Sequence, residues 1–168
     1  NAEPKRLPKD LRKVLTALTP GQKGIWLYGD TGTGKTHTVI AMAKHLVLGH
    51  RVRFQPMLDL LAEIKKTYRK DSSIGEDELI AKISSYPFLI LDDIAQLHRG
   101  GDFESRIVLQ ILDLRLRTGG TTTLVTSNPS PQEFESKMGW HGKRIVSRLY
   151  GLTMPLELTG SDYRKRKR

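Results

Sequence analysis

The sequence predicts an α/β fold in which a mainly parallel sheet carries helices on its faces. Short apolar runs of strand length alternate along the chain with longer segments that repeat apolar residues at helical spacing. This alternation is typical of βαβ units and of a parallel sheet. The chain has 168 residues, which is the size of one ordinary domain with a single compact core.

The pattern predicts five strands and six helices. The expected strands are the apolar runs Ile25–Tyr28, Val52–Gln55, Phe88–Leu91, Thr122–Thr126 and Thr153–Leu158. The expected helices are the segments Lys35–Leu48, Met57–Tyr68, Glu76–Ser84, Phe103–Arg117, Pro131–Met138 and Gly142–Tyr150. The fifth helix has a clear start, because Ser130 is a good N-cap, Pro131 suits the first turn and Glu133 completes a capping box.

The composition excludes some classes of protein and favours others. The formal net charge is +10, and an excess of this size is typical of proteins that bind polyanions. The chain contains no cysteine, so disulfide frameworks and thiolate metal clusters are excluded and a cytoplasmic location is favoured. Its apolar runs are far shorter than the ~20 residues that a membrane helix needs, so no membrane association is expected.

Proline, charge and periodicity divide the chain into three parts. Residues 1–20 are expected to form a basic lead-in or linker, residues 21–160 the folded domain, and residues 161–168 a basic tail. The tail suits either a solvated end or a contact with a phosphate backbone. The short segment after the last expected strand leaves no room for a helical lid, so none is expected.

The segment Gly29–Thr36 matches the phosphate-binding pattern G-x-x-x-x-G-K-[ST] between a strand and a helix, which is the context that this motif requires. The residues whose backbone is expected to surround phosphate oxygens are Gly29, Asp30, Thr31, Gly32, Thr33 and Gly34. Lys35 is expected to reach the β- and γ-phosphates and to act in catalysis, and the Thr36 hydroxyl is expected to ligate Mg²⁺. His37 completes the expected nucleotide-binding set. The alternative is a chance glycine-rich turn.

Two carboxylates follow the apolar run Phe88–Leu91 and form a Walker B pattern. Asp92 is expected to hold the metal, through water, and Asp93 to orient or deprotonate the attacking water. A turn or a helix cap is the alternative for this pair. Since another strand lies between the two motifs in the sequence, we expect a strand inserted between the two Walker strands of the sheet.

Four segments together resemble those of the AAA+ ATPases of the DnaC/DnaI helicase-loader and IstB transposition-helper group. They are Gly-Asp-Thr-Gly-Thr-Gly-Lys-Thr at 29–36, Leu-Ile-Leu-Asp-Asp-Ile at 89–94, Thr-Ser-Asn at 126–128 and Arg-Ile-Val-Ser-Arg-Leu at 144–149. They stand in the family's order, and the resemblance covers about residues 21–164. It implies a three-layer P-loop NTPase fold of the AAA+ type with a five-stranded parallel sheet, and ATP and Mg²⁺ as cofactors.

The resemblance also implies roles for residues outside the Walker motifs. Asn128 resembles sensor 1, which contacts the γ-phosphate or the lytic water; the alternative is a turn starter before Pro129. Arg148 resembles the arginine finger that reaches a neighbouring subunit's γ-phosphate, with Arg144 as the reserve candidate and an ordinary surface arginine as the alternative. A finger that acts in trans requires self-association. Arg164 resembles the family's closing sensor-2-like arginine, which also contacts nucleotide.

A basic and aromatic cluster after the second strand has the composition that single-stranded nucleic acid binding needs, which is positive charge beside a ring for base stacking. Its members are Lys65, Lys66, Tyr68, Arg69 and Lys70. The alternative is a solvated helix end, where cations favour the helix dipole without any ligand.

The expected function is ATP hydrolysis that organises subunits around single-stranded DNA and delivers a replicative DnaB-like helicase. One alternative is an IstB-type transposition helper that serves a transposase on duplex DNA. Another is a nucleotide-dependent binding module with little hydrolysis, because Asp93 is shorter than the usual Glu and would position water poorly. Small-molecule kinases are disfavoured because the expected domain has no lid.

Overall fold

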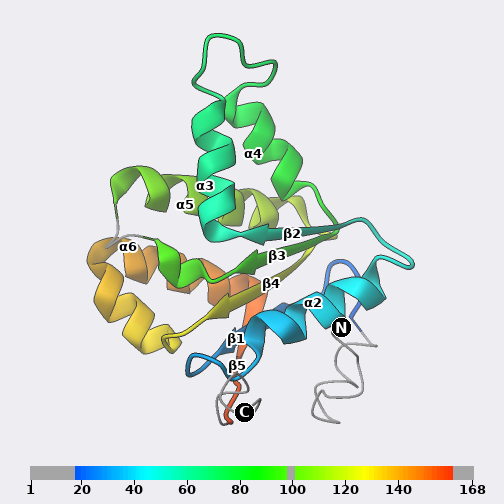
Figure 1. The fold of residues 1–168 in the computed structure, drawn as a ribbon, viewed down its shortest axis with the longest axis vertical. Helices are drawn as coiled ribbons and strands as arrows, with labels where there is room; N and C mark the ends of the chain where they lie inside the picture. The colour runs from blue at the N-terminus through cyan, green and yellow to red at the C-terminus, as the bar shows by residue number, and fades with distance from the viewer. Residues whose placement is uncertain (1–17, 98–100, 161–168) are drawn as a thin grey trace, which may run out of the picture.

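The computed structural model describes residues 18–97 and 101–160. Strands and helices alternate through these ranges (Figure 1). In chain order the elements are β1 (Gly24–Tyr28), α2 (Lys35–Leu46), β2 (Val52–Pro56), α3 (Met57–Lys66), α4 (Glu76–Ser84), β3 (Phe88–Asp92), the 3₁₀ turn η2 (Ile94–Gln96), α5 (Asp102–Thr118), β4 (Thr122–Ser127), α6 (Pro131–Leu152) and β5 (Thr153–Glu157). None of the helices in these ranges combines the length and the apolar character needed to cross a membrane.

The five strands form one parallel sheet in the order β2-β3-β4-β1-β5. β4 lies between β1, which precedes the phosphate loop, and β3, which ends in the first Walker B carboxylate. The expected α/β class, the parallel five-stranded sheet and the inserted strand are therefore confirmed. Between β5 and residue 160 the structure describes no further helix, and the absence of a lid beyond that point stays a prediction.

Apolar side chains pack on both faces of the sheet, as the near-continuous apolar strands require. In β3, Leu89 and Leu91 belong to a buried cluster with residues of α3, α4, α5 and α6. Phe88 and Ile90 point to the opposite face, because successive strand side chains alternate, and they pack with residues of α2. The described part of the chain thus has three layers, with four helices on one face of the sheet and α2 on the other.

Helix α6 spans Pro131–Leu152 and consists of two helical segments joined at a kink. The break that the sequence predicted here, between the helices Pro131–Met138 and Gly142–Tyr150, is therefore confirmed. Gly139 has φ 57° and ψ −130°, a conformation open almost only to glycine, and it bends α6 near the expected break. The predicted capping box is confirmed, because the Glu133 N–H donates to Ser130 Oγ at 3.3 Å and the Ser130 N–H donates to the Glu133 carboxylate at 2.8 Å.

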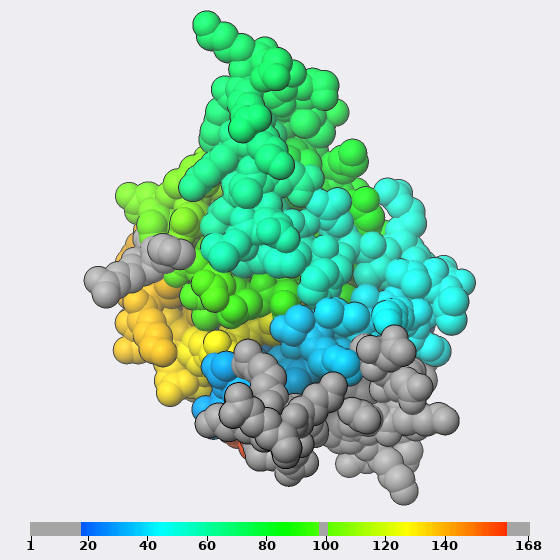
Figure 2. Space-filling view, viewed as in Figure 1, coloured from blue at the N-terminus to red at the C-terminus, as the bar shows by residue number. Residues whose placement is uncertain are grey.

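Helices α3 and α4 project beyond the β2 edge of the sheet (Figures 1 and 2). α3 ends at Lys66, two residues earlier than predicted, and residues 67–75 form the loop at the tip of this projection. Only one side of each helix is buried, against the cluster that covers the sheet. The tip is therefore an exposed surface that the rest of the domain holds in place.

Arg115 of α5 is buried at 1% exposure and joins α5 to β4 and to the end of α4. Its guanidinium donates to the Thr123 hydroxyl at 2.7 Å and to the carbonyl oxygens of Thr122, Ser84 and Tyr86 at 2.6–2.8 Å. Burial lowers its pKa to about 10, which leaves it charged at neutral pH. These bonds satisfy carbonyl groups that helix and sheet ends would otherwise leave unpaired.

Candidate active site

The phosphate loop connects β1 to α2 at the carboxyl edge of the sheet. Gly29 has φ 138°, and a Cβ atom at this position would lie 2.5 Å from the carbonyl oxygen of Leu158, so only glycine fits. Gly34 has φ 96° and is the N-cap of α2. The free N–H groups of the first turn of α2 therefore point out of the helix toward the loop, which is a typical anion-binding arrangement.

Backbone hydrogen bonds hold the loop in shape. The N–H and the hydroxyl of Thr33 both donate to the carbonyl oxygen of Asp30, at 3.4 and 2.8 Å. The Gly29 N–H donates to the carbonyl oxygen of Asn128 at 3.3 Å, which ties the start of the loop to the end of β4. The protein itself thus preorganises the loop for a phosphate.

Lys35 lies across this loop rather than in solvent. Its side chain is 7% exposed, and its ammonium group donates to the carbonyl oxygens of Gly29 and Asp30 at 2.7 and 2.8 Å. A longer contact of 3.5 Å joins it to the Thr33 hydroxyl. The charge of Lys35 is therefore already directed at the space where the loop could hold phosphate oxygens.

Thr36 and Asp92 form the oxygen group that could hold Mg²⁺. The Thr36 hydroxyl donates to the Asp92 carboxylate, with distances of 3.0 and 3.1 Å to its two oxygens. Asp92 is 7% exposed and also accepts from the Thr126 hydroxyl at 2.7 Å. A carboxylate and a hydroxyl side by side fit Mg²⁺, which prefers hard oxygen ligands and keeps several waters.

Asp93 has an unusual backbone conformation. With φ 55° and ψ 55° it is the one residue other than glycine with positive φ in the described ranges, which costs on the order of 1 kcal/mol. Its N–H donates to the Thr126 hydroxyl at 2.8 Å, and its carboxylate accepts from the Gln96 side chain at 2.9 Å. Thr126, whose role the sequence reasoning missed, thus bonds both Walker B residues, through the carboxylate of Asp92 and the backbone N–H of Asp93. Four of the six residues of β4 are Thr or Ser, so composition gave no signal that singled out Thr126.

Asn128 follows β4 directly, at the carboxyl edge between the two Walker strands. Its side chain is exposed, while its carbonyl oxygen accepts from the phosphate loop. His37 is exposed in the first turn of α2. The expected site residues that the structure brings to this one edge are Lys35, Thr36, Asp92, Asp93 and Asn128.

The arginines expected to complete the site do not join this group. Arg148 lies near the end of α6, where it forms an ion pair with Asp113 of α5 at 2.8 Å. Arg144 is exposed one turn earlier. Arg164 falls outside the described residues. Within the described part of one chain, the site therefore contains Lys35 but none of the expected arginines.

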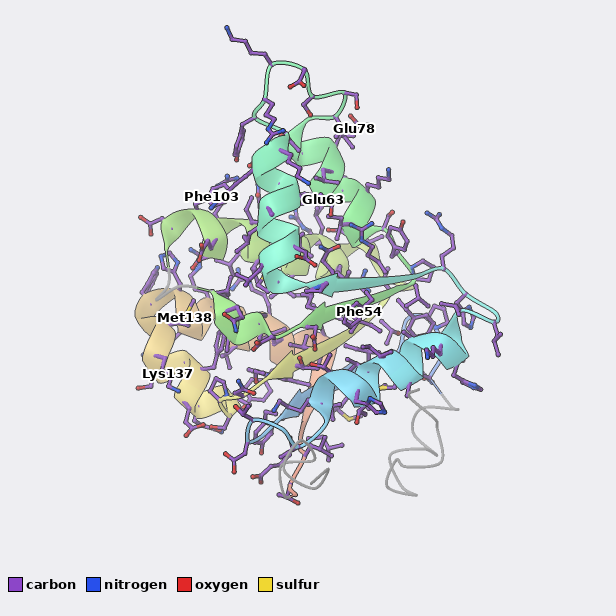
Figure 3. The ribbon with its side chains drawn as sticks, in the orientation of Figure 1. Phe54, Glu63, Glu78, Phe103, Lys137 and Met138 are labelled. Carbon is purple, nitrogen blue, oxygen red and sulfur yellow. The ribbon has the colours of Figure 1, made fainter. Side chains whose placement is uncertain are left out.

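The predicted nucleic-acid residues are exposed on and after the end of α3, and the fold adds two further residues to them. Phe103 lies at the start of α5 (Figure 3). The centres of the Phe103 and Tyr68 rings are 6.2 Å apart, and the Lys65 ammonium lies 5.7 Å from the Phe103 ring centre. Arg106 lies over the same ring at 5.5 Å. The sequence reasoning missed Phe103 and Arg106 because they are distant from Lys65 in the chain. We call the side chains of Lys65, Lys66, Tyr68, Arg69, Lys70, Phe103 and Arg106 the tip surface; Phe103 is half-buried and the others are exposed.

One carboxylate, Glu76, connects the members of the tip surface. It accepts from Arg106, at 2.6 and 3.0 Å to its two oxygens, and from the Tyr68 hydroxyl. The hydrogen bond from Arg106 lowers the pKa of the Glu76 carboxyl, and the hydrogen bond to Glu76 raises the pKa of the Tyr68 hydroxyl. Glu76 therefore offsets one of the five positive charges of the tip surface, and the exposed acids Asp71, Asp77 and Glu78 follow four of these cations in the sequence.

Comparison with known proteins identifies proteins that are similar to this chain. A family model described as IstB-like ATP binding protein matches residues 2–168. The replicative helicase loader DnaC of Buchnera aphidicola subsp. Acyrthosiphon pisum (strain APS) is 29% identical over 139 residues, which are 82% of this chain and 54% of that protein. This chain thus spans about half the length of that relative.

Solved structures share the fold. The crystal structure of a DnaC helicase loader has a TM-score of 0.79 at 23% identity and covers 95% of this chain and 97% of its own. A replication initiator DnaA bound to AMPPCP and single-stranded DNA has a TM-score of 0.72 at 24% identity, over 90% of this chain and 44% of its own. The predicted AAA+ fold is therefore confirmed.

Proposed function

Because the chain belongs to the IstB-like ATP-binding protein family, we propose that it hydrolyses ATP to ADP and phosphate and that it serves as a replicative helicase loader. The observation that carries the ATPase proposal is the placing of Lys35, Thr36 and both Walker B carboxylates at one edge of the sheet. These are the groups that phosphoryl transfer to water needs, namely phosphate binding, charge neutralisation and an oriented nucleophile.

Each residue at this edge has a proposed part. The loop N–H groups and Lys35 bind the β- and γ-phosphates and hold the γ-phosphate in position. Thr36 and Asp92 hold Mg²⁺, which neutralises charge on the phosphates when it is bound. Asp93 orients the attacking water and accepts its proton, and the exposed side chain of Asn128 contacts that water or the γ-phosphate.

The site is completed in trans in this proposal. Arg148 supplies an arginine finger to the ATP of a neighbouring subunit, with Arg144 as the reserve candidate, and Arg164 contacts nucleotide from the chain end. Support comes from the position of Arg148 near the end of α6, away from its own phosphate loop. ATP binding would thus promote self-association, and hydrolysis would require it.

The assembly would work on single-stranded DNA and a replicative DnaB-like helicase. The positive, partly aromatic tip surface supports DNA binding, because bases stack on rings while cations track the backbone. Relatives named as replicative helicase loaders support the choice of partner. This role would place the protein in the cytoplasm.

Phosphate release measured with and without single-stranded DNA tests the ATPase proposal. We expect Lys35→Ala and Asp93→Asn each to lower turnover by about 10²–10³-fold, as the loss of a preorganised charged group does. Lys44→Ala, in an exposed position of the same helix α2, is the matched control and should be neutral. Equal, very slow release by the wild type and both variants would favour a nucleotide-dependent binding module instead. That alternative is motivated by the short side chain of Asp93.

A second assay tests the loading role. Purified chain should retain a replicative helicase on beads in the presence of ATP, and should bind single-stranded in preference to duplex oligonucleotides. The family description favours one competing function, an IstB-type transposition helper. Preference for duplex DNA and retention of a transposase would establish that function and reject helicase loading.

A further inference from the structure

Arg148 does not extend freely from α6 but is held by a carboxylate of the neighbouring helix. Its Nε donates to Asp113 Oδ1 of α5 at 2.8 Å, and its Nη1 donates to the Arg144 carbonyl oxygen at 3.2 Å. Both side chains of the ion pair are partly exposed, at 27% for Arg148 and 34% for Asp113. In the described part of the chain, these bonds leave Nη2 of the guanidinium available to a further acceptor.

The topology separates Arg148 from the phosphate loop of its own chain. Arg148 lies about one turn before Leu152, and the next residue, Thr153, pairs with Gly24 at the start of β1. The phosphate loop follows Tyr28 at the other end of β1, about 13 Å further along the strand direction. Arg148 therefore lies toward the amino edge of the sheet, away from the phosphate loop of its own chain.

The bond to Asp113 matters for orientation more than for folding. A partly exposed ion pair contributes less than about 1 kcal/mol to stability. A free arginine side chain, in contrast, has about 2 kcal/mol of rotamer entropy to lose when it is fixed. A carboxylate that binds the Nε side of the guanidinium fixes the rotamer in advance and leaves the outer N–H groups for a phosphate.

We propose that Asp113 is a positioning residue, which holds Arg148 in the rotamer that enters the phosphate site of a neighbouring subunit. This inference rests on the proposed function, since it assumes that Arg148 acts in trans. It assigns Asp113 to the subunit that donates the finger and gives it no part in the subunit that holds the ATP. That asymmetry distinguishes positioning from general support of the fold.

Subunit mixing makes the asymmetry measurable. Lys35→Ala subunits can donate Arg148 but cannot use ATP, and Arg148→Ala subunits can hold ATP but cannot donate the finger. We expect the mixture to hydrolyse ATP although neither variant does so alone. Asp113→Asn added to the Lys35→Ala subunit should lower kcat of the mixture by about 10–100-fold, as misplacement of a catalytic group does, with KM for ATP unchanged.

The same substitution in the other subunit is the internal control. Asp113→Asn added to the Arg148→Ala subunit should leave the rate unchanged, because that subunit donates no finger. Asp113→Glu on the donating subunit keeps the carboxylate and should restore most of the rate, and Asp59→Asn, an exposed acid of α3, should have no effect. Melting of each variant should confirm that it folds.

The possible outcomes distinguish failure of the positioning role of Asp113 from failure of the proposed arginine finger in trans. If the parent mixture does not hydrolyse ATP, the finger in trans is wrong, and the role of Asp113 is rejected with it. If the parent mixture is active but Asp113→Asn acts equally in both subunits, has no effect in either, or raises the rate, the positioning role alone is overturned.

Discussion

The phosphate edge of the sheet and the tip surface are built in opposite ways. At the edge, Lys35 and Asp92 are each 7% exposed, and the loop backbone and Thr126 hold their polar atoms in place. At the tip, Tyr68 is 57% exposed, and its hydroxyl contacts the half-buried Glu76 and the exposed Arg106. Groups proposed for chemistry are thus fixed by the sheet, whereas groups proposed for binding a polymer are held mainly by other side chains, although Phe103 also packs against the core.

This difference follows from what each task requires. Phosphoryl transfer is sensitive to small displacements of the reacting groups, so the supporting atoms must belong to rigid elements. Binding of a nucleic-acid backbone depends on summed charge and stacking, which tolerate moderate changes in side-chain position. Substitutions should therefore have all-or-none effects at the edge and graded effects at the tip.

The largest effect is expected from Gly29→Ala. The new Cβ would lie 2.5 Å from the Leu158 carbonyl oxygen at a φ of 138°, so we expect a loss of about 3 kcal/mol of stability together with loss of nucleotide binding. Urea unfolding and titration with a fluorescent ATP analogue would measure both. Gly49→Ala is the matched control, because a Cβ there has nothing within 4 Å and needs no left-handed backbone. Equal behaviour of the two variants would contradict the comparison, since the phosphate edge would then be as tolerant as an exposed loop.

A smaller effect is expected from Phe103→Ala at the tip. Removal of one stacking ring should weaken binding of single-stranded DNA by about 1–2 kcal/mol and leave basal ATP turnover unchanged. Phe103→Trp should retain the affinity, because every base can stack on either ring. Trp140→Ala, which removes an aromatic side chain of α6 that is 72% exposed, is the control for loss of any exposed ring. Equal weakening by the two alanine variants, in a filter-binding or anisotropy assay, would reject the tip as the DNA surface.

The smallest effect is expected from Glu76→Gln, which removes the one carboxylate that joins Tyr68 to Arg106. Because the hydrogen bond from Arg106 lowers the pKa of the Glu76 carboxyl in the folded state below its ordinary value, the stabilisation is fully present above that ordinary pKa. It is lost as the pH falls through the lower folded-state pKa. Arg106 is 44% exposed, so we expect a difference of less than about 1 kcal/mol at pH 7.

Urea unfolding at several pH values measures this difference between wild type and Glu76→Gln, which should vanish in acid. The same substitution should bring the pKa of the Tyr68 hydroxyl back toward its ordinary value, because the bond to Glu76 is the main cause of its rise. An absorbance titration would follow that change. A difference that persists unchanged in acid would mean that the substitution acts through packing rather than through the ion pair.

Local sequence determined much of this fold because its signals act over a few residues. The alternation of apolar runs placed all five strands, and the Ser130 capping box marked the start of α6. The predicted break in the same region is present, because Gly139 takes a non-helical conformation that divides α6 into two helical segments. Some helix boundaries, such as the end of α3, differ from their predicted positions. The conformation of residues at a helix end depends on tertiary contacts as well as on helix propensity.

Local patterns predicted some residues of the candidate site, whereas only the folded structure revealed the role of others. Spacing alone predicted Lys35, Thr36, Asp92 and Asp93 as site residues, because a phosphate loop and a strand-end acid pair are local patterns. Thr126 could not be found in this way, since its role depends on β4 lying beside β3 in the sheet. The predicted roles of Asn128 and Arg148, and of Arg164 outside the described residues, stay predictions.

Sequence by itself determined which residues could bind a phosphate. The conformation of a glycine-rich turn before a helix depends on the φ angles of a few consecutive residues, so a local pattern is enough to predict it. Sequence also determined the charge and the alternation that predicts a parallel sheet. Only the tertiary structure decided which distant residues meet: Thr126 with the Asp92 carboxylate and the Asp93 backbone, Phe103 with Lys65, Arg115 with the carbonyl groups of three segments, and Asp113 with Arg148. Such contacts join residues far apart in the chain, and they form only when the order of strands and the packing of helices bring those residues within bonding distance.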